Sequence, residues 1–196
     1  MYPNCGIEFD FTDMGKVEIL SDKIKNNTKL LWIETPTNPT LKITDINKIS
    51  NHIKKTLNRE DIMIAVDNTF ATPYFQNPLN LGADLVVHSV TKYIGGHSDV
   101  VMGCVVCNDK ELYEKLRFVQ NSVGAVPSPF DCYMALRGLK TLHVRMARSQ
   151  ENAIKISNFL ETNKNVEKCI YPGLNSHPEH LICKNQMKGS ASMITF

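Results

Sequence analysis

The stretch that decides the fold is ADLVVHSVTKYIGGHSD, residues 83–99. It begins as an apolar run typical of a buried strand and passes into hydroxyl residues, a lysine and two glycines. Lysine side chains normally lie in solvent, yet Lys92 stands where the strand is expected to end. Two earlier apolar runs, KLLWIE at 29–34 and DIMIAV at 61–66, also pass into polar residues. The pattern of an apolar, strand-like run followed by polar residues therefore occurs three times.

The remaining sequence alternates between strand-like and helix-like patterns. Helices are expected at 43–57 with Asp45 as N-cap, at 109–124, after Ser128, and at 141–162. Further strands are expected at 6–11, 99–108, 166–173 and from 191. Because the strands are mostly apolar throughout, we predict an α/β fold with a mainly parallel sheet covered on both faces. In the helix at 109–124 we expect Leu112, Leu116 and Val119 to face the interior.

Composition narrows the class of function. The net charge of +2 gives no broad electrostatic case for nucleic acid or for an acidic membrane. No apolar run approaches the length of a bilayer span, and the first residues lack a secretory signal pattern. The pair Cys104 and Cys107 lies in a strand-like run, where positions three apart point to opposite faces, so we interpret it as core thiols and not as a redox or zinc site. The scattered cysteines favour a cytoplasmic protein.

The polar residues that follow the three strands are expected to converge, because ligands of open parallel sheets bind beyond the carboxyl ends of the strands. Taken singly, each has an ordinary explanation: an Asp caps a turn, a Lys is solvated, and Ser-x-Thr is common in turns. The combined set is Thr35, Thr37 and Asn38, then Asp67, Asn68 and Thr69, then His88, Ser89, Thr91 and Lys92. It offers a carboxylate, a primary amine, hydroxyls and amides to one pocket.

One chemistry uses all of these groups, namely pyridoxal 5'-phosphate catalysis. The cofactor aldehyde requires a primary amine, and its pyridine nitrogen stays protonated only beside a carboxylate. Its phosphate requires hydroxyl and backbone donors, and an amide can serve its phenolic oxygen. Asp67 and Lys92 are separated by one crossover between strands, so they can reach opposite parts of one ring.

Long motifs in the chain resemble the Cys/Met-metabolism family of pyridoxal-phosphate enzymes. They are WIETPTNPT at 32–40, the stretch from VDNTF at 66 to VVMG at 103, GAVPSPFDCYMALRGLKTLHVRM at 124–146, and YPGLNSHPEH at 171–180. The resemblance implies the fold type I of aspartate aminotransferase, a three-layer α/β/α arrangement. It also implies that residues 1–145 are part of the large cofactor-binding domain, without its N-terminal portion, and that 146–196 begin a smaller C-terminal α+β domain.

The resemblance also assigns roles to individual residues. It makes Lys92 the lysine that binds the cofactor covalently and Asp67 the partner of the pyridine nitrogen. Ser89 and Thr91 would contact the phosphate, and Asn38 would lie near the phenolic oxygen. No metal is implied.

The function implied is that of a carbon–sulfur lyase of transsulfuration and cysteine biosynthesis. It would cleave cystathionine to cysteine, 2-oxobutanoate and ammonia, with release of hydrogen sulfide as a side activity. The partners expected are a small sulfur amino acid and further copies of the chain, as a tetramer in the family. Three alternatives stay open: formation of cystathionine, cleavage of methionine, and a truncated relative without activity. Family members are longer than this chain, and Arg137 and Arg145 are expected to be structural and not to bind substrate.

Overall fold

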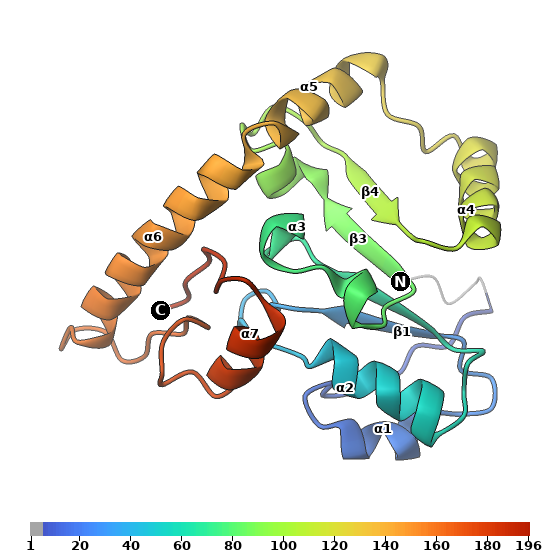
Figure 1. Cartoon of the computed structure of the whole chain (residues 1–196), viewed down its shortest axis with the longest axis horizontal. Helices are drawn as coiled ribbons and strands as arrows, with labels where there is room; N and C mark the ends of the chain where they lie inside the picture. Colours follow the sequence, from blue (N-terminus) through green and yellow to red (C-terminus); the bar gives the residue numbers. More distant parts are fainter. Residues whose placement is uncertain (1–5) are drawn as a thin grey trace.

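The computed structural model describes residues 6–196, and its centre is a four-stranded sheet (Figure 1). The strands are β1 (Leu30–Glu34), β2 (Met63–Asp67), β3 (Leu85–Ser89) and β4 (Gly103–Val106), in the spatial order β1-β2-β3-β4. β1, β2 and β3 run parallel, and β4 is antiparallel to β3. The predicted α/β class with a mainly parallel sheet is confirmed.

Helical segments connect the strands and form most of the C-terminal part. They are α1 (Val17–Lys23), α2 (Ile46–Asn51), η2 (His52–Thr56), α3 (Thr72–Phe75), η3 (Pro78–Leu81), η4 (Val90–Ile94), α4 (Lys110–Val123), α5 (Pro129–Leu139), α6 (Leu142–Glu161) and α7 (His180–Gln186). The helix predicted over 43–57 is present as α2 continued by the π-helical turn η2. Its start is the predicted one, because the Asp45 side chain accepts from Lys48 N at 2.9 Å.

One face of the sheet packs against α1, α2 and η2. Alternate residues of β1 and β2 project from this face into an isoleucine-rich core, and every one of them is buried: Leu31, Ile33, Ile64 and Val66. The helices contribute Leu20, Ile46, Ile49 and Ile53. Burial of apolar area on this scale is the main favourable term in folding, so this face supplies most of the stability of the sheet.

The opposite face of the sheet is open over β1 and the start of β2 in the described chain, whereas Ala65 and Leu85 on the same face are buried. Leu30, Trp32 and Met63 project from it, and Trp32 is 53% exposed. Because strand residues alternate between faces, the register pair Glu34 and Asp67 lies on this open face too. The two faces of the sheet are therefore covered unequally.

The strand predicted at 6–11 is wrong. These residues lie outside regular structure, and Ile7, Phe9 and Phe11 are exposed. The alternating pattern was correct for a strand, but no neighbouring strand pairs with this segment among the described residues. The strands predicted at 166–173 and from 191 shrink to one isolated bridge between Ile170 and Thr195.

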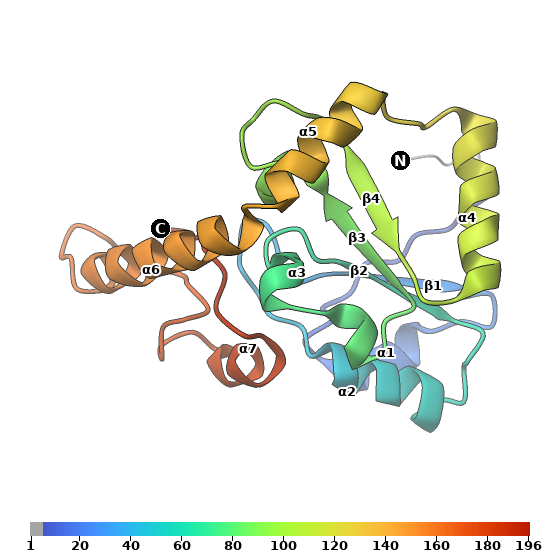
Figure 2. The ribbon, with the colours of Figure 1, turned by 45° about the horizontal axis from the view of Figure 1, so that its top comes forward.

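Helix α4 has the predicted bounds but not the predicted burial. Asp109 caps its start through Leu112 N at 2.7 Å, and Gly124 ends it at φ +78°. No residue of α4 is fully buried. Of the predicted interior positions, Leu112 and Leu116 are half-buried, whereas Val119 is 55% exposed, so the prediction is wrong for Val119 within the described chain. In both views α4 lies beyond the end of β4 and away from α6 (Figures 1 and 2).

The C-terminal segments pack on the end of the sheet through α3 and α6. Ser128 caps α5 as predicted, its hydroxyl accepting from Asp131 N at 3.1 Å. Met146 of α6 and Met187, just after α7, join Phe75 of α3 in a second core. The predicted domain boundary between residues 145 and 146 falls inside α6, and the division itself stays a prediction.

No helix within residues 6–196 is both long enough and apolar enough to cross a membrane. No group of three or more His, Cys, Asp or Glu side chains there could hold a metal ion.

Candidate functional site

The predicted site begins with a chain of hydrogen bonds between the ends of β2 and β3. Asp67 Oδ1 accepts from Thr69 Oγ1 at 2.6 Å and from Thr69 N at 3.0 Å. Thr69 Oγ1 in turn accepts from Ser89 N at 2.9 Å. Thr69 thus orients the Asp67 carboxylate and fixes it relative to the start of the segment that carries Lys92.

Lys92 lies in η4, three residues after Ser89. Its backbone leaves the helical region at ψ −116°, and its side chain is exposed without a hydrogen bond or ion pair to any residue in the described range. Arg145 of α6 holds the next turn, since its Nη1 donates to Tyr93 O at 2.6 Å and its Nη2 to Gly138 O at 2.8 Å. The lysine is therefore on a braced turn while its amine is free to react.

The contact of α5 with this turn depends on a glycine. A Cβ at Gly138 would clash with Gly95 O, so no larger residue fits without a shift of the backbone. Arg145 and Gly138 together confirm that Arg145 has a structural role in the described chain.

Thr91 has a different environment from the one its predicted role requires. Its hydroxyl donates to Met102 O at 3.3 Å and accepts from Met102 N at 3.0 Å. Both bonds join η4 to the segment before β4. Contact between Thr91 and a phosphate stays a prediction, and the hydroxyl would have to rotate away from Met102 O to donate.

Asn38 lies in the loop after β1 and is connected to the strand end by Glu34. Glu34 Oε1 accepts from Asn38 N at 3.2 Å. Glu34 is also the register partner of Asp67, and both side chains project from the open face. Loss of solvation, together with the negative charge of Asp67, raises the pKa of Glu34.

His88 projects from the covered face, one residue before Ser89. It is buried, and burial lowers its pKa, which the charge of Asp67 offsets only in part. Its Nδ1 has no hydrogen-bond partner among the described residues. A neutral imidazole beside the strand ends is the consequence.

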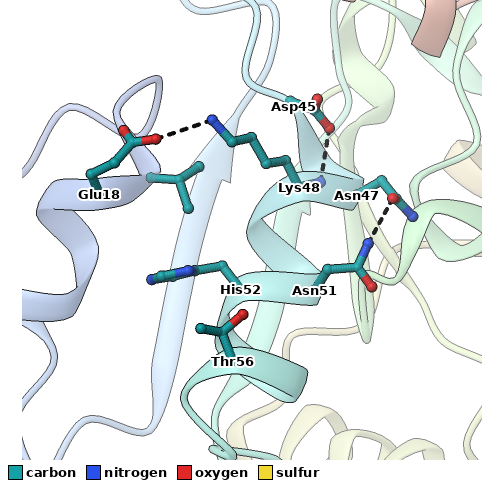
Figure 3. Close-up of a pocket in the computed structure, with 8 residues that line it drawn as sticks. Glu18, Asp45, Asn47, Lys48, Asn51, His52 and Thr56 are labelled. Atoms are coloured by element: carbon teal, nitrogen blue, oxygen red, sulfur yellow. Dashed lines mark hydrogen bonds and ion pairs between the residues drawn. The ribbon is translucent and has the colours of Figure 1, made fainter.

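Two hollows lie near the sheet, and neither coincides with the open face. A hollow of about 390 Å³ borders Asn68, Gln76 and His88 on the covered side. Another, of about 450 Å³, lies between α1 and α2 (Figure 3). Its polar side chains bind one another: Glu18 pairs with Lys48 at 3.2 Å, and Asn51 Nδ2 donates to Asn47 Oδ1 at 2.8 Å. The second hollow touches none of the predicted site residues.

The structure thus brings Asp67, Ser89 and Asn38 to neighbouring ends of β1, β2 and β3, with Lys92 on the following turn. Sequence reasoning did not assign roles to Thr69 or Glu34, and it predicted a structural role for Arg145 without naming its partners. Thr69 could have been found from its position two residues after Asp67, a spacing typical of an Asx turn. The partner of Arg145 could not have been found, because Tyr93 lies 52 residues earlier in the chain.

The chain belongs to the Cys/Met metabolism PLP-dependent enzyme family, whose model matches residues 1–196. The family description confirms the cofactor predicted from the sequence, pyridoxal 5'-phosphate. The donor set fits that molecule, since the open strand ends offer a free amine at Lys92 and a carboxylate at Asp67 that is oriented by two hydrogen bonds.

Individual relatives are similar along nearly the whole chain. It is 56% identical over 193 residues to cystathionine gamma-lyase of Dictyostelium discoideum, an alignment that covers 98% of this chain and 49% of that protein. It is 53% identical over 190 residues to a probable cystathionine gamma-synthase of Herpetosiphon aurantiacus, covering 97% of this chain and 58% of that protein. The chain therefore spans about half the length of the curated relatives it matches.

A solved structure shows the same fold. The crystal structure of cystathionine gamma-lyase from Lactobacillus plantarum complexed with L-serine is 41% identical, with a TM-score of 0.92. The match covers 96% of this chain and 49% of that one. The predicted fold class, that of the PLP-dependent transsulfuration enzymes, is confirmed.

Proposed function

We propose that this chain is part of a PLP-dependent carbon–sulfur lyase that cleaves L-cystathionine to L-cysteine, 2-oxobutanoate and ammonia. The observation that carries the proposal is the hydrogen-bonded series Asp67–Thr69–Ser89, which ends one turn before the free amine of Lys92. The identity with cystathionine gamma-lyases supports the choice of reaction.

Each residue has a defined task in this proposal. Lys92 would hold the cofactor covalently and, as a neutral amine, take a proton from the α-carbon of the substrate and return one later. Asp67 would keep the ring nitrogen protonated, while Ser89 and Thr91 would bind the phosphate and Asn38 the phenolic oxygen. When bound, the cofactor supplies an electron sink for the carbanion.

A spectroscopic titration tests the proposal. Purified protein supplemented with pyridoxal 5'-phosphate should show a visible absorption band that disappears on borohydride reduction and is absent in Lys92→Ala. Lys110→Ala, which changes an exposed lysine at the start of α4, should keep the band. A wild-type protein without the band would refute the proposal and favour a relative without activity.

A second candidate reaction is the formation of cystathionine. The similarity to a protein named probable cystathionine gamma-synthase favours it as the alternative. Product analysis with cystathionine, an O-acylhomoserine and methionine distinguishes the lyase, the synthase and a lyase that acts on methionine. Amino-acid release from cystathionine alone is the outcome expected.

We also propose that the protein works as a homo-oligomer, a tetramer as in the family, and in the cytoplasm. Support for assembly comes from the large apolar side chains that α4 and α5 expose, among them Phe118, Phe130 and Leu136. The free thiols Cys104 and Cys183 are consistent with a reducing compartment. The mass of the native particle and the location of a tagged protein test these two proposals.

A further inference from the structure

Three side-chain amides form one continuous chain from helix α7 to the strand ends. Gln186 Nε2 donates to Gln76 Oε1 at 2.8 Å, and Gln76 Nε2 donates to Asn68 Oδ1 at 2.8 Å. Asn68 Nδ2 donates back to Gln76 O at 2.9 Å. Asn68 is 0% and Gln76 is 1% exposed, so this polar chain lies inside the protein, where an unpaired amide is costly.

The orientation of the Gln186 amide is fixed by its surroundings. Its Oε1 accepts from Ile46 N at 2.9 Å, and its Nε2 also donates to Thr44 O at 3.0 Å. A rotated amide would set its NH₂ group against the Ile46 N–H and its oxygen against two acceptors. Gln186 therefore fits in one orientation and joins the start of α2 to Gln76.

The amide chain reaches the residues of the candidate site. Gln76 Nε2 also donates to Thr35 O at 3.2 Å, and Thr35 N donates to Asp67 O at 3.3 Å. Asn68 directly follows Asp67 in the chain. Gln76 thus holds the end of β2 directly at Asn68 and, through Thr35, at the carbonyl of Asp67.

The same amides also close the loop that carries Asn38. Thr44 N donates to Thr35 Oγ1 at 3.0 Å, so the two ends of the loop are tied together. Gln186 holds Thr44 O at one end, and through Gln76 it holds Thr35 O at the other. One side chain of α7 therefore limits the movement of both Asp67 and Asn38.

We propose that Gln186 is a positioning residue for the strand-end site. It touches no group assigned to the cofactor and acts through Gln76, so that the C-terminal segment determines how the carboxylate of Asp67 and the loop of Asn38 are presented. This inference rests on the proposed function, because it concerns the geometry in which the same cofactor is held.

The experiment compares two glutamines of the full chain. Gln186→Leu removes the amide at nearly constant volume, and Gln186→Glu keeps the size but replaces the donor. Gln150→Leu is the matched control, because Gln150 Oε1 accepts from Ser190 N at 2.6 Å and makes no contact with the strand ends. Hydrogen exchange of peptides covering 33–45 and 66–70 is measured without cofactor, and cofactor affinity is then titrated by visible absorption.

Both Gln186 variants should lose protection in these two peptides and bind pyridoxal 5'-phosphate about tenfold more weakly, the loss expected for one buried polar group left unpaired. The pH midpoint of the visible band should also rise. A looser Asp67 leaves the ring nitrogen less protonated, and the nitrogen linking Lys92 to the cofactor then keeps its proton to higher pH. Gln150→Leu should leave all three readouts unchanged.

Other outcomes overturn the inference in distinguishable ways. Unchanged protection would show that Gln186 does not order the strand ends. Lost protection with unchanged affinity and midpoint would reduce Gln186 to a purely structural residue. Equal effects of Gln150→Leu would mean that any damage to the C-terminal segment has the same consequence. A wild-type chain that takes up no cofactor would refute the proposed function itself, and the positioning role with it.

Discussion

The two faces of the central sheet differ in what they contribute. On the covered face, Ile33, Ile64 and Val66 are at most 1% exposed and pack against α1 and α2. On the open face, Trp32 is half exposed and the polar pair Glu34 and Asp67 marks the strand ends. The same β-strands therefore supply stability through one set of alternate residues and chemistry through the other. Substitutions on the two faces should affect different measurements.

The largest effect is expected from two neighbours on β2 that point to opposite faces. Ile64→Ala deletes a fully buried side chain and should lower the free energy of unfolding by about 2–5 kcal/mol. Met63→Ala, on the open face, should cost less than about 1 kcal/mol. Denaturant unfolding monitored by circular dichroism gives both values. Equal losses of unfolding free energy in the two variants would show that the open face is covered in solution, and would contradict the proposed difference between the faces.

A smaller effect, confined to the site, is expected from Thr69→Val. The substitution keeps the volume but removes the hydroxyl that joins Asp67 to Ser89, so cofactor affinity should fall about tenfold. The visible absorption titration measures this. Thr162→Val, which loses an exposed hydroxyl at the C-cap of α6, should leave the affinity unchanged. A normal affinity in Thr69→Val would show that Asp67 needs no orientation by this hydroxyl.

The N-caps of two helices provide a second comparison, between α2, which packs on the covered face, and α4, which does not. Asp45→Ala removes the N-cap of α2, which packs on the covered face, and should cost about 1 kcal/mol in global stability. Asp109→Ala removes an equivalent cap from α4, which has no fully buried residue, so it should fray that helix without moving the global transition. The urea midpoint and hydrogen exchange of residues 110–123 separate the two results. A shift of the midpoint in Asp109→Ala would contradict this expectation.

The smallest effect is a change in pH dependence at Glu34. Its pKa is raised above the ordinary value of 4.5, so folding disfavours the ionised carboxylate and stability falls as the pH rises through the raised pKa. Glu34→Gln should therefore be more stable than wild type at neutral pH, and the difference should vanish below pH 4.5. Thermal unfolding across this range measures it. A stability advantage that persists at low pH would have to come from something other than titration.

Local signals in the sequence predicted the four strands of the sheet and three of the helix starts. Asp45, Asp109 and Ser128 each precede a helix and bond to the backbone three residues later, a relation that needs no knowledge of the rest of the fold. The apolar runs that became β1, β2 and β3 were equally clear. The order of polar residues after these runs was sufficient to name Asp67, Ser89 and Lys92 as candidates.

Features that depend on distant partners could not be predicted in this way. The alternation of Ile7, Phe9 and Phe11 is the pattern of a strand, but pairing decides whether a strand forms. The apolar spacing of α4 predicted a buried side, and in the described chain this side is covered only in part, at Leu112 and Leu116. Gln186 looks like an ordinary helix residue in sequence, because its partners Thr44 and Gln76 lie 142 and 110 residues away. The short helices α1 and α7 were missed altogether.

The position of Gln186 near the end of this sequence has a consequence for folding during translation. Strands β1, β2 and β3 and the helices that cover them are synthesised before α7, at roughly 5–20 residues per second, and domains fold as units during synthesis. After the loop at 35–44 and the end of β2, more than a hundred further residues must be synthesised before Gln186 of α7 can form the hydrogen bonds that hold these two segments. The sheet can therefore fold before the residues at its binding edge are held in place. A nascent chain stalled before residue 186 should have a folded core but a mobile segment around Asp67.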